Sequence, residues 1–387
     1  MEKLSAEELI QLIETVFPHF PEDRQLGILV DIPVNREMDH DRWKLRREIA
    51  REWVLILKEN ISRLKINDVL LVAYPDVGSN NADLPEYGYY LKNQLPEKAE
   101  ELEKMGEKID FKQIFSNNQL FLAPTEYSTT APLKNAAKIF GFRAGTMPGF
   151  SPEMIPALRI DYEEVFRRVN ILKEKLDPAL RAEVKFRVDG KKEYKIEFDL
   201  RFRTSHLSSG RFPERGTAGN VPSGETYIVP YEGETGENTG TCGILPVQIK
   251  NEVLLFEVKD NRAVDVKGES GIRDIESLKA EQIHLEREPA YGNMAELGFG
   301  VLGDFGLKPI GEILLDEKLG FHVAFGRSDH FGGMVGPDDF SSPQEVIHLD
   351  RVYISSLQPR IMVESVRLGY EKNKTETIIK EGKYLVF

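Results

Sequence analysis

The sequence has 387 residues, 41% of them hydrophobic and 30% charged, which is the composition of a globular protein with more than one domain. Its net charge of −13 would repel a phosphate backbone, so we expect no nucleic-acid partner. No window approaches eighteen consecutive apolar residues, and the N-terminal residues lack a secretory leader. The single cysteine, Cys242, cannot form an intramolecular disulfide. Together these features predict a cytoplasmic protein that does not enter a membrane.

In the first half of the chain, short apolar runs alternate with amphipathic segments, a pattern that is typical of an α/β unit with a mostly parallel sheet. A capping box at Ser5 to Glu8 begins the first of these segments. The predicted helices cover residues 5–17, 41–58, 96–108, 131–141 and 162–176, and the predicted strands cover 27–33, 68–75 and 119–124. We interpret the basic run at 42–51 as the solvated face of a buried helix, with a partner surface as the alternative.

The pattern changes near residue 180. Apolar and polar residues alternate on both sides of Asp189-Gly190, which predicts a β-hairpin. Short strands and glycines dominate from there onward. We therefore predict an α/β domain over residues 1–180, followed by an α+β, strand-rich metal-binding domain over 181–387.

Histidines and carboxylates gather in the predicted strands of the second half. In VIHLDRVY, His348 and Asp350 stand two residues apart and would share one face of a strand. His322 lies in GFHVAFG, and Glu225 and Glu296 lie beside glycines in PSGET and AELGFG. Such mixed nitrogen and oxygen donors suit a divalent cation. Taken singly, the His-x-Asp pair also fits a surface ion pair, and His322 also fits a hydrogen-bonded core histidine.

The segment after Glu296 contains Gly298-x-Gly300-x-x-Gly303, a spacing found in dinucleotide-binding loops. No apolar strand leads into this segment, and no helix with a suitably placed acidic residue follows it. We therefore reject the dinucleotide interpretation and expect a flexible turn that presents Glu296.

Taken in order, NVPSGETYIVP, AELGFG, LLDEKLGFHVAFG and VIHLD resemble the metal-binding series of the aminopeptidase T/aminopeptidase S family of thermophilic-type metallo-aminopeptidases. The resemblance covers about residues 199–355. It implies a two-metal site, with zinc, cobalt or manganese as the expected ions and magnesium as a further option. The ligands that it implies are Glu225, Glu296, His322, His348 and Asp350.

The resemblance also implies a hydrolase that releases N-terminal residues from peptide substrates and assembles as a homodimer. A carboxylate at such a site can accept the proton of the attacking water, so we assign Glu296 a catalytic role. Glu317, five residues before His322, is the rival base because the ligand set does not require it.

One departure from the family pattern lies seven residues after His322, where the family has tyrosine and this chain has Asp329 followed by His330. We expect one of these two side chains to reach the metal or the substrate carbonyl. Two alternatives to the peptidase remain open. The first is a mononuclear non-haem Fe(II) ring-cleaving dioxygenase that uses His322, His348 and Asp350. The second is a metal- or peptide-binding relative without activity.

Overall fold

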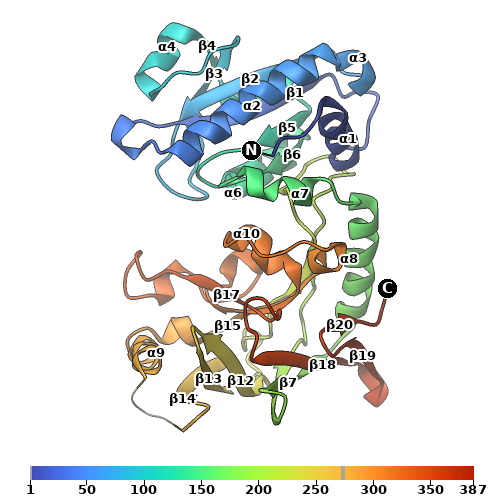
Figure 1. Cartoon of the computed structure of the whole chain (residues 1–387), viewed down its shortest axis with the longest axis vertical. Helices are drawn as coiled ribbons and strands as arrows, with labels where there is room; N and C mark the ends of the chain where they lie inside the picture. Colours follow the sequence, from blue (N-terminus) through green and yellow to red (C-terminus); the bar gives the residue numbers. More distant parts are fainter. Residues whose placement is uncertain (1, 272–274) are drawn as a thin grey trace. The chain divides into compact units, whose positions relative to one another are not determined.

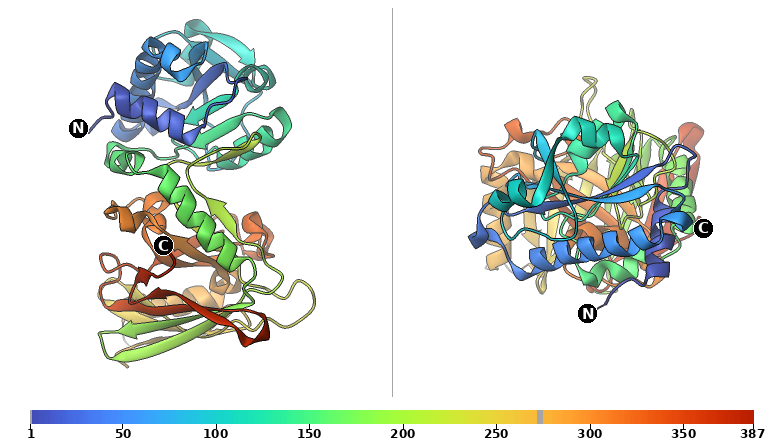
Figure 2. Two further views of the ribbon diagram at one scale, coloured as in Figure 1. Left: turned by 90° about the vertical axis from the view of Figure 1, so that its right-hand side faces the viewer. Right: turned by 90° about the horizontal axis from the view of Figure 1, so that it is seen from above.

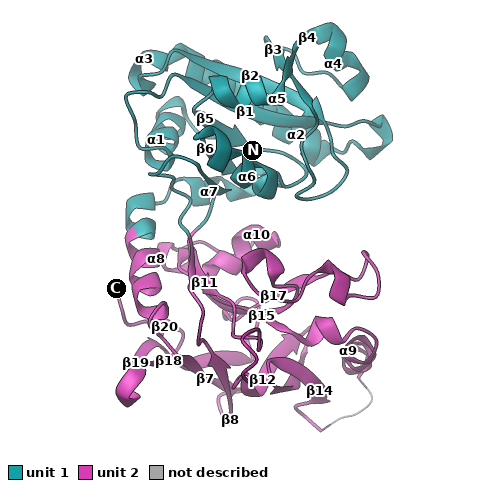
Figure 3. Cartoon of the chain, turned by 180° about the vertical axis from the view of Figure 1, so that it is seen from behind, with its two compact units in different colours: residues 1–166, 208–223 teal, residues 167–207, 224–387 magenta. Residues whose placement is uncertain are grey.

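The computed structural model describes residues 2–271 and 275–387, which form two compact units (Figure 3). The first unit comprises residues 1–166 and 208–223, and the second comprises 167–207 and 224–387. This division differs from the single boundary that the sequence suggested near residue 180. The reason is that β10 (Thr217–Asn220) pairs in parallel with β6 (Arg143–Thr146), which joins residues 208–223 to the first unit.

The first unit contains a mostly parallel sheet, as expected from its alternating pattern. Its strand order is β10-β6-β5-β1-β2-β3-β4, and only the β2–β3 and β3–β4 pairs within the described residues are antiparallel. The remaining strands are β1 (Gln25–Ile32), β2 (Asp68–Pro75), β3 (Tyr87–Leu91), β4 (Gly106–Asp110) and β5 (Leu120–Ala123). The helices are α1 (Ala6–Val16), α2 (Asp41–Glu59), α3 (Ile61–Leu64), α4 (Leu102–Met105), α5 (Phe111–Asn117), α6 (Thr130–Phe140) and α7 (Ile155–Leu158).

Packing in this unit follows the hydrophobic pattern of the sequence. The capping box at Ser5 and Glu8 begins α1, and α2 packs along β1 and β2 (Figure 1). The predicted helix at 96–108 is wrong in its second part. Residues 106–110 form the edge strand β4 instead, which pairs antiparallel with β3, and the missing side chain of Gly106 leaves room for Leu91 of that strand.

The basic run on α2 is not wholly solvated. Arg46 and Arg47 are buried, and each is held by partners within the first unit. The Arg46 guanidinium donates to the Phe150 carbonyl and to Glu126, while Arg47 forms two hydrogen bonds with Asp39. The interpretation of this run as a solvated face is therefore wrong for these two residues.

The second unit consists mainly of two antiparallel sheets. The larger has the order β14-β13-β12-β8-β7-β18-β19-β20. In Figure 2, its early strand β7 and its late strand β18 lie side by side, in agreement with their antiparallel pairing. Its strands are β7 (Arg181–Val188), β8 (Lys192–Asp199), β12 (Cys242–Ile249), β13 (Glu252–Lys259), β14 (Arg262–Gly268), β18 (Ile361–Gly369), β19 (Thr375–Lys380) and β20 (Lys383–Tyr384). The predicted hairpin is confirmed, since β7 and β8 pair across Asp189 and Gly190, which both have positive φ.

The smaller sheet has the order β17-β16-β15-β11-β9. Its strands are β9 (His206–Ser208), β11 (Glu225–Ile228), β15 (Met294–Gly300), β16 (Phe321–Gly326) and β17 (His348–Val352). Helices α8 (Tyr162–Leu176), α9 (Glu276–Arg287) and α10 (Ile313–Asp316) complete the described part of the chain, and α8 begins in the first unit. None of the described helices is long and apolar enough to cross a membrane.

Candidate metal centre

The register of the smaller sheet brings the predicted ligands to one face. Glu225 lies opposite Gly300, Glu296 opposite Ala324, and Ala324 in turn opposite Asp350. His322 lies opposite Gly298, and His348 opposite Gly326. Laterally paired residues in a sheet point to the same side, so the donors of β11, β15, β16 and β17 project together. The intervening positions on this face are glycine or alanine, which leaves room for the larger side chains.

The glycines of β15 serve close packing. A Cβ atom on Gly298 would collide with the imidazole of His322, and one on Gly300 would collide with the backbone of Lys318. Both glycines lie in a fully buried strand, so the expected flexible turn after Glu296 is wrong. The Gly298-x-Gly300 spacing allows the next strand and its histidine to approach, which agrees with the rejection of a dinucleotide loop.

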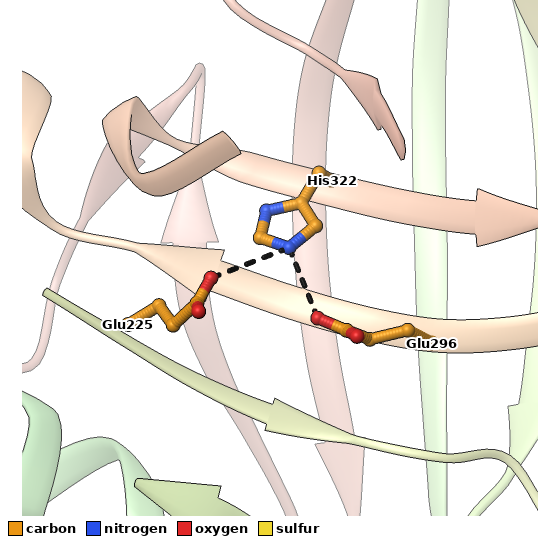
Figure 4. A group of neighbouring side chains, drawn as sticks. All are labelled: Glu225, Glu296 and His322. Atoms are coloured by element: carbon orange, nitrogen blue, oxygen red, sulfur yellow. Dashed lines mark hydrogen bonds and ion pairs between the residues drawn. The ribbon is translucent and has the colours of Figure 1, made fainter. Parts of the chain in front are cut away.

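Glu296 lies between the two histidines. Its Oε1 atom is 3.2 Å from His322 Nε2, and its Oε2 atom is 3.4 Å from His348 Nε2. A second carboxylate accompanies each imidazole: Glu225 Oε2 lies 3.6 Å from His322 Nε2 (Figure 4), and Asp350 Oδ1 lies 3.7 Å from His348 Nε2. The five residues therefore form two sets of donors that share Glu296.

The opposite nitrogen of each imidazole is held by the backbone. His322 Nδ1 lies 3.1 Å from the Gly320 carbonyl oxygen, and His348 Nδ1 lies 2.8 Å from the Arg327 carbonyl oxygen. A carbonyl can only accept a hydrogen bond, so each Nδ1 must donate. This arrangement directs both Nε2 atoms toward the carboxylates and is the usual orientation of a metal-ligating histidine.

The surrounding charges strongly favour cations. Burial alone would lower the pKa of His322, but its hydrogen bond with Glu296 and the charges of Asp350, Glu296 and Glu225 outweigh burial and raise that pKa to about 10. Burial also lowers the pKa of His348, but the neighbouring carboxylates of Asp350 and Glu296 outweigh burial and raise that pKa well above its ordinary value. Without a metal, both imidazoles therefore take up protons to balance the carboxylates.

Two residues outside the predicted ligand set also belong to this cluster. Lys318 is 1% exposed, and its Nζ atom donates to Glu225 Oε1 at 3.0 Å and to Glu317. Burial raises the pKa of Glu317, and the negative charges of Asp350 and Glu225 raise it further, against the effect of Lys318. Glu317 was considered as a base from the sequence, but Lys318 was not identified, because its place next to Glu317 in the chain does not indicate that it is buried.

The free oxygen of Glu225, the spacing of the donor atoms and the charge balance all fit a divalent cation. Glu225 Oε2 is buried and has no hydrogen-bond partner among the described residues, although its Oε1 atom is held by Lys318. Glu225, Glu296 and His322 each offer a ligand atom within 4.8 Å of the others. Even with Glu317 neutral, Glu225, Glu296 and Asp350 face the single ammonium of Lys318, so neutral imidazoles leave an excess of two negative charges, which buried sites do not tolerate without a counter-ion.

The Asp329–His330 pair lies beside the cluster. Asp329 is bound by the guanidinium of Arg327. The His330 ring lies edge-on to the His348 ring, with 5.3 Å between the centroids. Burial and the positive charges of His348 and Arg327 lower the pKa of His330 to about 4. Whether either side chain reaches a metal or a substrate stays a prediction.

The comparisons with known proteins agree with this fold. No protein-family model and no curated protein matches the sequence. The structure of 2,5-dihydroxypyridine dioxygenase from Pseudomonas putida KT2440 is 15% identical, aligns over 100% of this chain and 99% of that one, and has a TM-score of 0.61. Wild-type AmpT from Thermus thermophilus, an aminopeptidase, is 13% identical, aligns over 98% of each chain, and has a TM-score of 0.52. The chain thus shares a two-domain, aminopeptidase-like fold with both proteins, and at this identity the similarity establishes the fold alone.

Proposed function

We propose that the chain is a metal-dependent aminopeptidase that holds two divalent ions with Glu225, Glu296, His322, His348 and Asp350. The main support is the position of Glu296. Its two oxygens face different histidines, and each histidine has a further carboxylate beside it. A carboxylate shared between two donor sets is the arrangement expected for a co-catalytic pair of ions.

In this proposal, the chain's own residues position the ligands and handle the proton. Lys318 holds one oxygen of Glu225 and leaves the other free for a cation. The Gly320 and Arg327 carbonyls fix the two imidazoles, and Glu296 accepts the proton of the attacking water, with Glu317 as the rival base. When bound, the two metal ions would polarise the scissile carbonyl and lower the pKa of that water.

The remaining parts of the proposal concern substrate, ions and assembly. The substrates are peptides with a free α-amino group, and the ions are zinc, cobalt or manganese, with magnesium as a further option. We further propose a cytoplasmic homodimer.

A second function, ring cleavage by a mononuclear Fe(II) dioxygenase, is favoured by a different observation. Lys318 already occupies one oxygen of Glu225, which weakens the case for a second ion there. His322, His348 and Asp350 alone would supply two histidines and one carboxylate, the ligand set of many non-haem iron oxygenases. A relative that binds metal or peptide without turnover is the third possibility.

Metal stoichiometry and substrate panels separate these functions. The purified full-length protein would be titrated with Zn²⁺, Co²⁺ and Fe²⁺, and then assayed with amino-acid p-nitroanilides and, under oxygen, with dihydroxypyridines. We expect two ions per chain and release of p-nitroaniline. A stoichiometry that never exceeds one ion, with oxygen uptake on the ring substrate, would establish the dioxygenase instead. Metal binding without either reaction would support the non-catalytic relative.

The variant Glu225→Gln sharpens this test, because the peptidase requires Glu225 and a three-ligand iron site does not. We expect it to lose one of the two ions and at least about 100-fold in kcat, on the scale of a lost catalytic group. Glu183→Gln is the matched control, since Glu183 is also buried in the second unit but is bound by Lys195 and Arg367. If Glu225→Gln behaves like this control in ion count and in kcat, the two-metal proposal is wrong.

A further inference from the structure

Tyr227 combines a buried ring with an unpaired, accessible hydroxyl. The residue is 8% exposed, and its hydroxyl has no hydrogen-bond partner among the described residues, yet this atom is not one of the fully buried ones. Two other buried tyrosines, Tyr162 and Tyr353, each donate to a backbone carbonyl. The Tyr74 hydroxyl also lacks a partner among the described residues, but it is fully buried, whereas the Tyr227 hydroxyl is not. Buried tyrosine hydroxyls usually find such a partner, so the free hydroxyl of Tyr227 requires another explanation.

The sheet register places Tyr227 beside the donor cluster. It lies two residues after Glu225 on β11, so the two side chains share a face. Across the sheet, Tyr227 pairs with Gly298, and Gly298 pairs with His322. Since Gly298 contributes no side chain between them, the row Tyr227–Gly298–His322 leaves the tyrosine facing the same space as the first set of donors.

Aromatic contacts fix the orientation of this tyrosine. The Phe331 ring lies edge-on to Tyr227 with 4.8 Å between centroids, and it also contacts the His348 ring at 5.4 Å. The His206 ring stacks on Tyr227 at 5.2 Å, and its Nε2 atom is hydrogen-bonded to the Phe331 carbonyl at 2.9 Å. The ring of Tyr227 is therefore held against the same loop residue that packs on a proposed ligand.

We propose that the Tyr227 hydroxyl donates a hydrogen bond to the substrate carbonyl oxygen and to the negative charge that develops there as water attacks. This inference rests on the proposed peptidase function. A phenol is a neutral donor with one proton to offer, and the groups beside it on this face, Glu225, Glu296 and His322, are assigned to metal binding. Tyr227 is thus the group left free to bind the reacting oxygen, in the role of an oxyanion-hole donor.

The test is Tyr227→Phe in the full-length, metal-saturated protein, assayed with the best substrate of the p-nitroanilide panel. We expect kcat to fall about 100-fold or more, with KM and the number of bound ions unchanged, as for the loss of one oxyanion donor. The matched control is Tyr353→Phe, which removes a buried hydroxyl that donates to the Pro246 carbonyl. This control should keep the wild-type kcat.

A second measurement does not depend on turnover. The aminophosphonate that carries the side chain of the best substrate mimics the tetrahedral, anionic state, and its binding can be measured by calorimetry. Tyr227→Phe should weaken its binding by a factor similar to the loss in kcat, while binding of the free amino acid stays the same. If wild type is active and Tyr227→Phe matches it in kcat and in phosphonate binding, the role of Tyr227 is wrong and the peptidase stands. If wild type neither cleaves the panel nor binds the phosphonate, both proposals fail.

Discussion

Asp31 in the first unit and Glu225 in the second are both buried carboxylates, but they differ in what surrounds their oxygens. Both oxygens of Asp31 accept hydrogen bonds from N–H groups, namely those of the Trp43 indole and of the Glu126 and Tyr127 backbone, at 2.9 to 3.0 Å. Glu225 has Lys318 at one oxygen and no hydrogen-bond partner among the described residues at the other. Asp31 thus joins the end of β1 to the segment after β5, whereas Glu225 keeps an acceptor free.

This difference shows why burial of charge does not by itself identify a functional site. In the first unit, the buried pair of Arg143 and Asp23, 2.6 Å apart, is completed by the carbonyls of Pro18 and Phe212. Each of these charges has a protein partner. In the second unit, the carboxylates outnumber their cationic partners, and the histidines present their Nε2 atoms to the excess. An incomplete set of partners, in a buried position, is what indicates an external ligand.

The largest expected effect distinguishes a buried carboxylate of the second unit from one of the first unit. Glu296→Gln keeps the size and one oxygen of the side chain, and we expect kcat to fall by about 10²–10⁴-fold because the proposed proton acceptor is lost. Asp31→Asn, which changes the buried carboxylate of the first unit, should leave kcat unchanged. Both would be measured at saturating metal, with the bound ions counted. Should Glu317→Gln be inactive while Glu296→Gln stays near wild type, the catalytic assignment moves to Glu317.

The two buried ion pairs provide the next contrast. Lys318→Met leaves Glu225 and Glu317 without their ammonium, and Arg143→Met leaves Asp23 without its guanidinium. Loss of one partner of a buried pair costs about 3–5 kcal/mol, so both variants should be destabilised in metal-free buffer. Saturating Zn²⁺ should narrow the difference from wild type only in Lys318→Met, because a cation can replace the missing charge there, whereas Arg143→Met keeps the donor cluster and should gain only as much from Zn²⁺ as wild type does. Thermal unfolding with and without metal measures this. An equal response of the two variants to Zn²⁺ would contradict the contrast.

The sequence predicted the parts of the site that depend on local pattern. The strand that carries His348 and Asp350 follows from its alternating residues, the strand that carries His322 follows from its apolar and small residues, and the hairpin at Asp189-Gly190 follows from its turn. Tyr227 was within reach of the same reasoning, because it shares a strand face with Glu225. Lys318 was not, since its burial depends on the contact of its backbone with Gly300, which lies eighteen residues earlier in a neighbouring strand.

Domain assignment shows the same limit. Residues 217–220 contain no long apolar run, and their place in the first sheet depends on pairing with β6, more than seventy residues earlier. The prediction of a turn at Gly298 and Gly300, which lie in β15, was wrong for a related reason. A glycine that admits a neighbouring side chain and one that bends the chain look alike in sequence.

The smallest expected effect is a pH dependence confined to the first unit. Burial raises the pKa of Asp31 to about 6, although hydrogen bonds from Glu126, Tyr127 and Trp43 oppose this rise. The folded state therefore binds this proton more tightly than the unfolded chain, whose aspartates titrate near pH 4. The resulting stabilisation is complete below about pH 4 and is lost as the pH rises through about 6. Its size is about 3 kcal/mol, since the two pKa values differ by about two units.

Asp31→Asn removes this titration, so its free energy of unfolding relative to wild type should increase by about 3 kcal/mol between pH 4 and pH 7.5. Any cost of placing an amide against the Tyr127 N–H is independent of pH and does not alter this slope. Trp43 and Trp53, the only two tryptophans, both lie on α2, so their fluorescence during urea unfolding follows the first unit alone. Asp83→Asn, at an exposed position, controls for the loss of one carboxyl group. A difference between Asp31→Asn and wild type that stays constant with pH would mean that Asp31 remains ionised throughout, held by its N–H donors despite its burial.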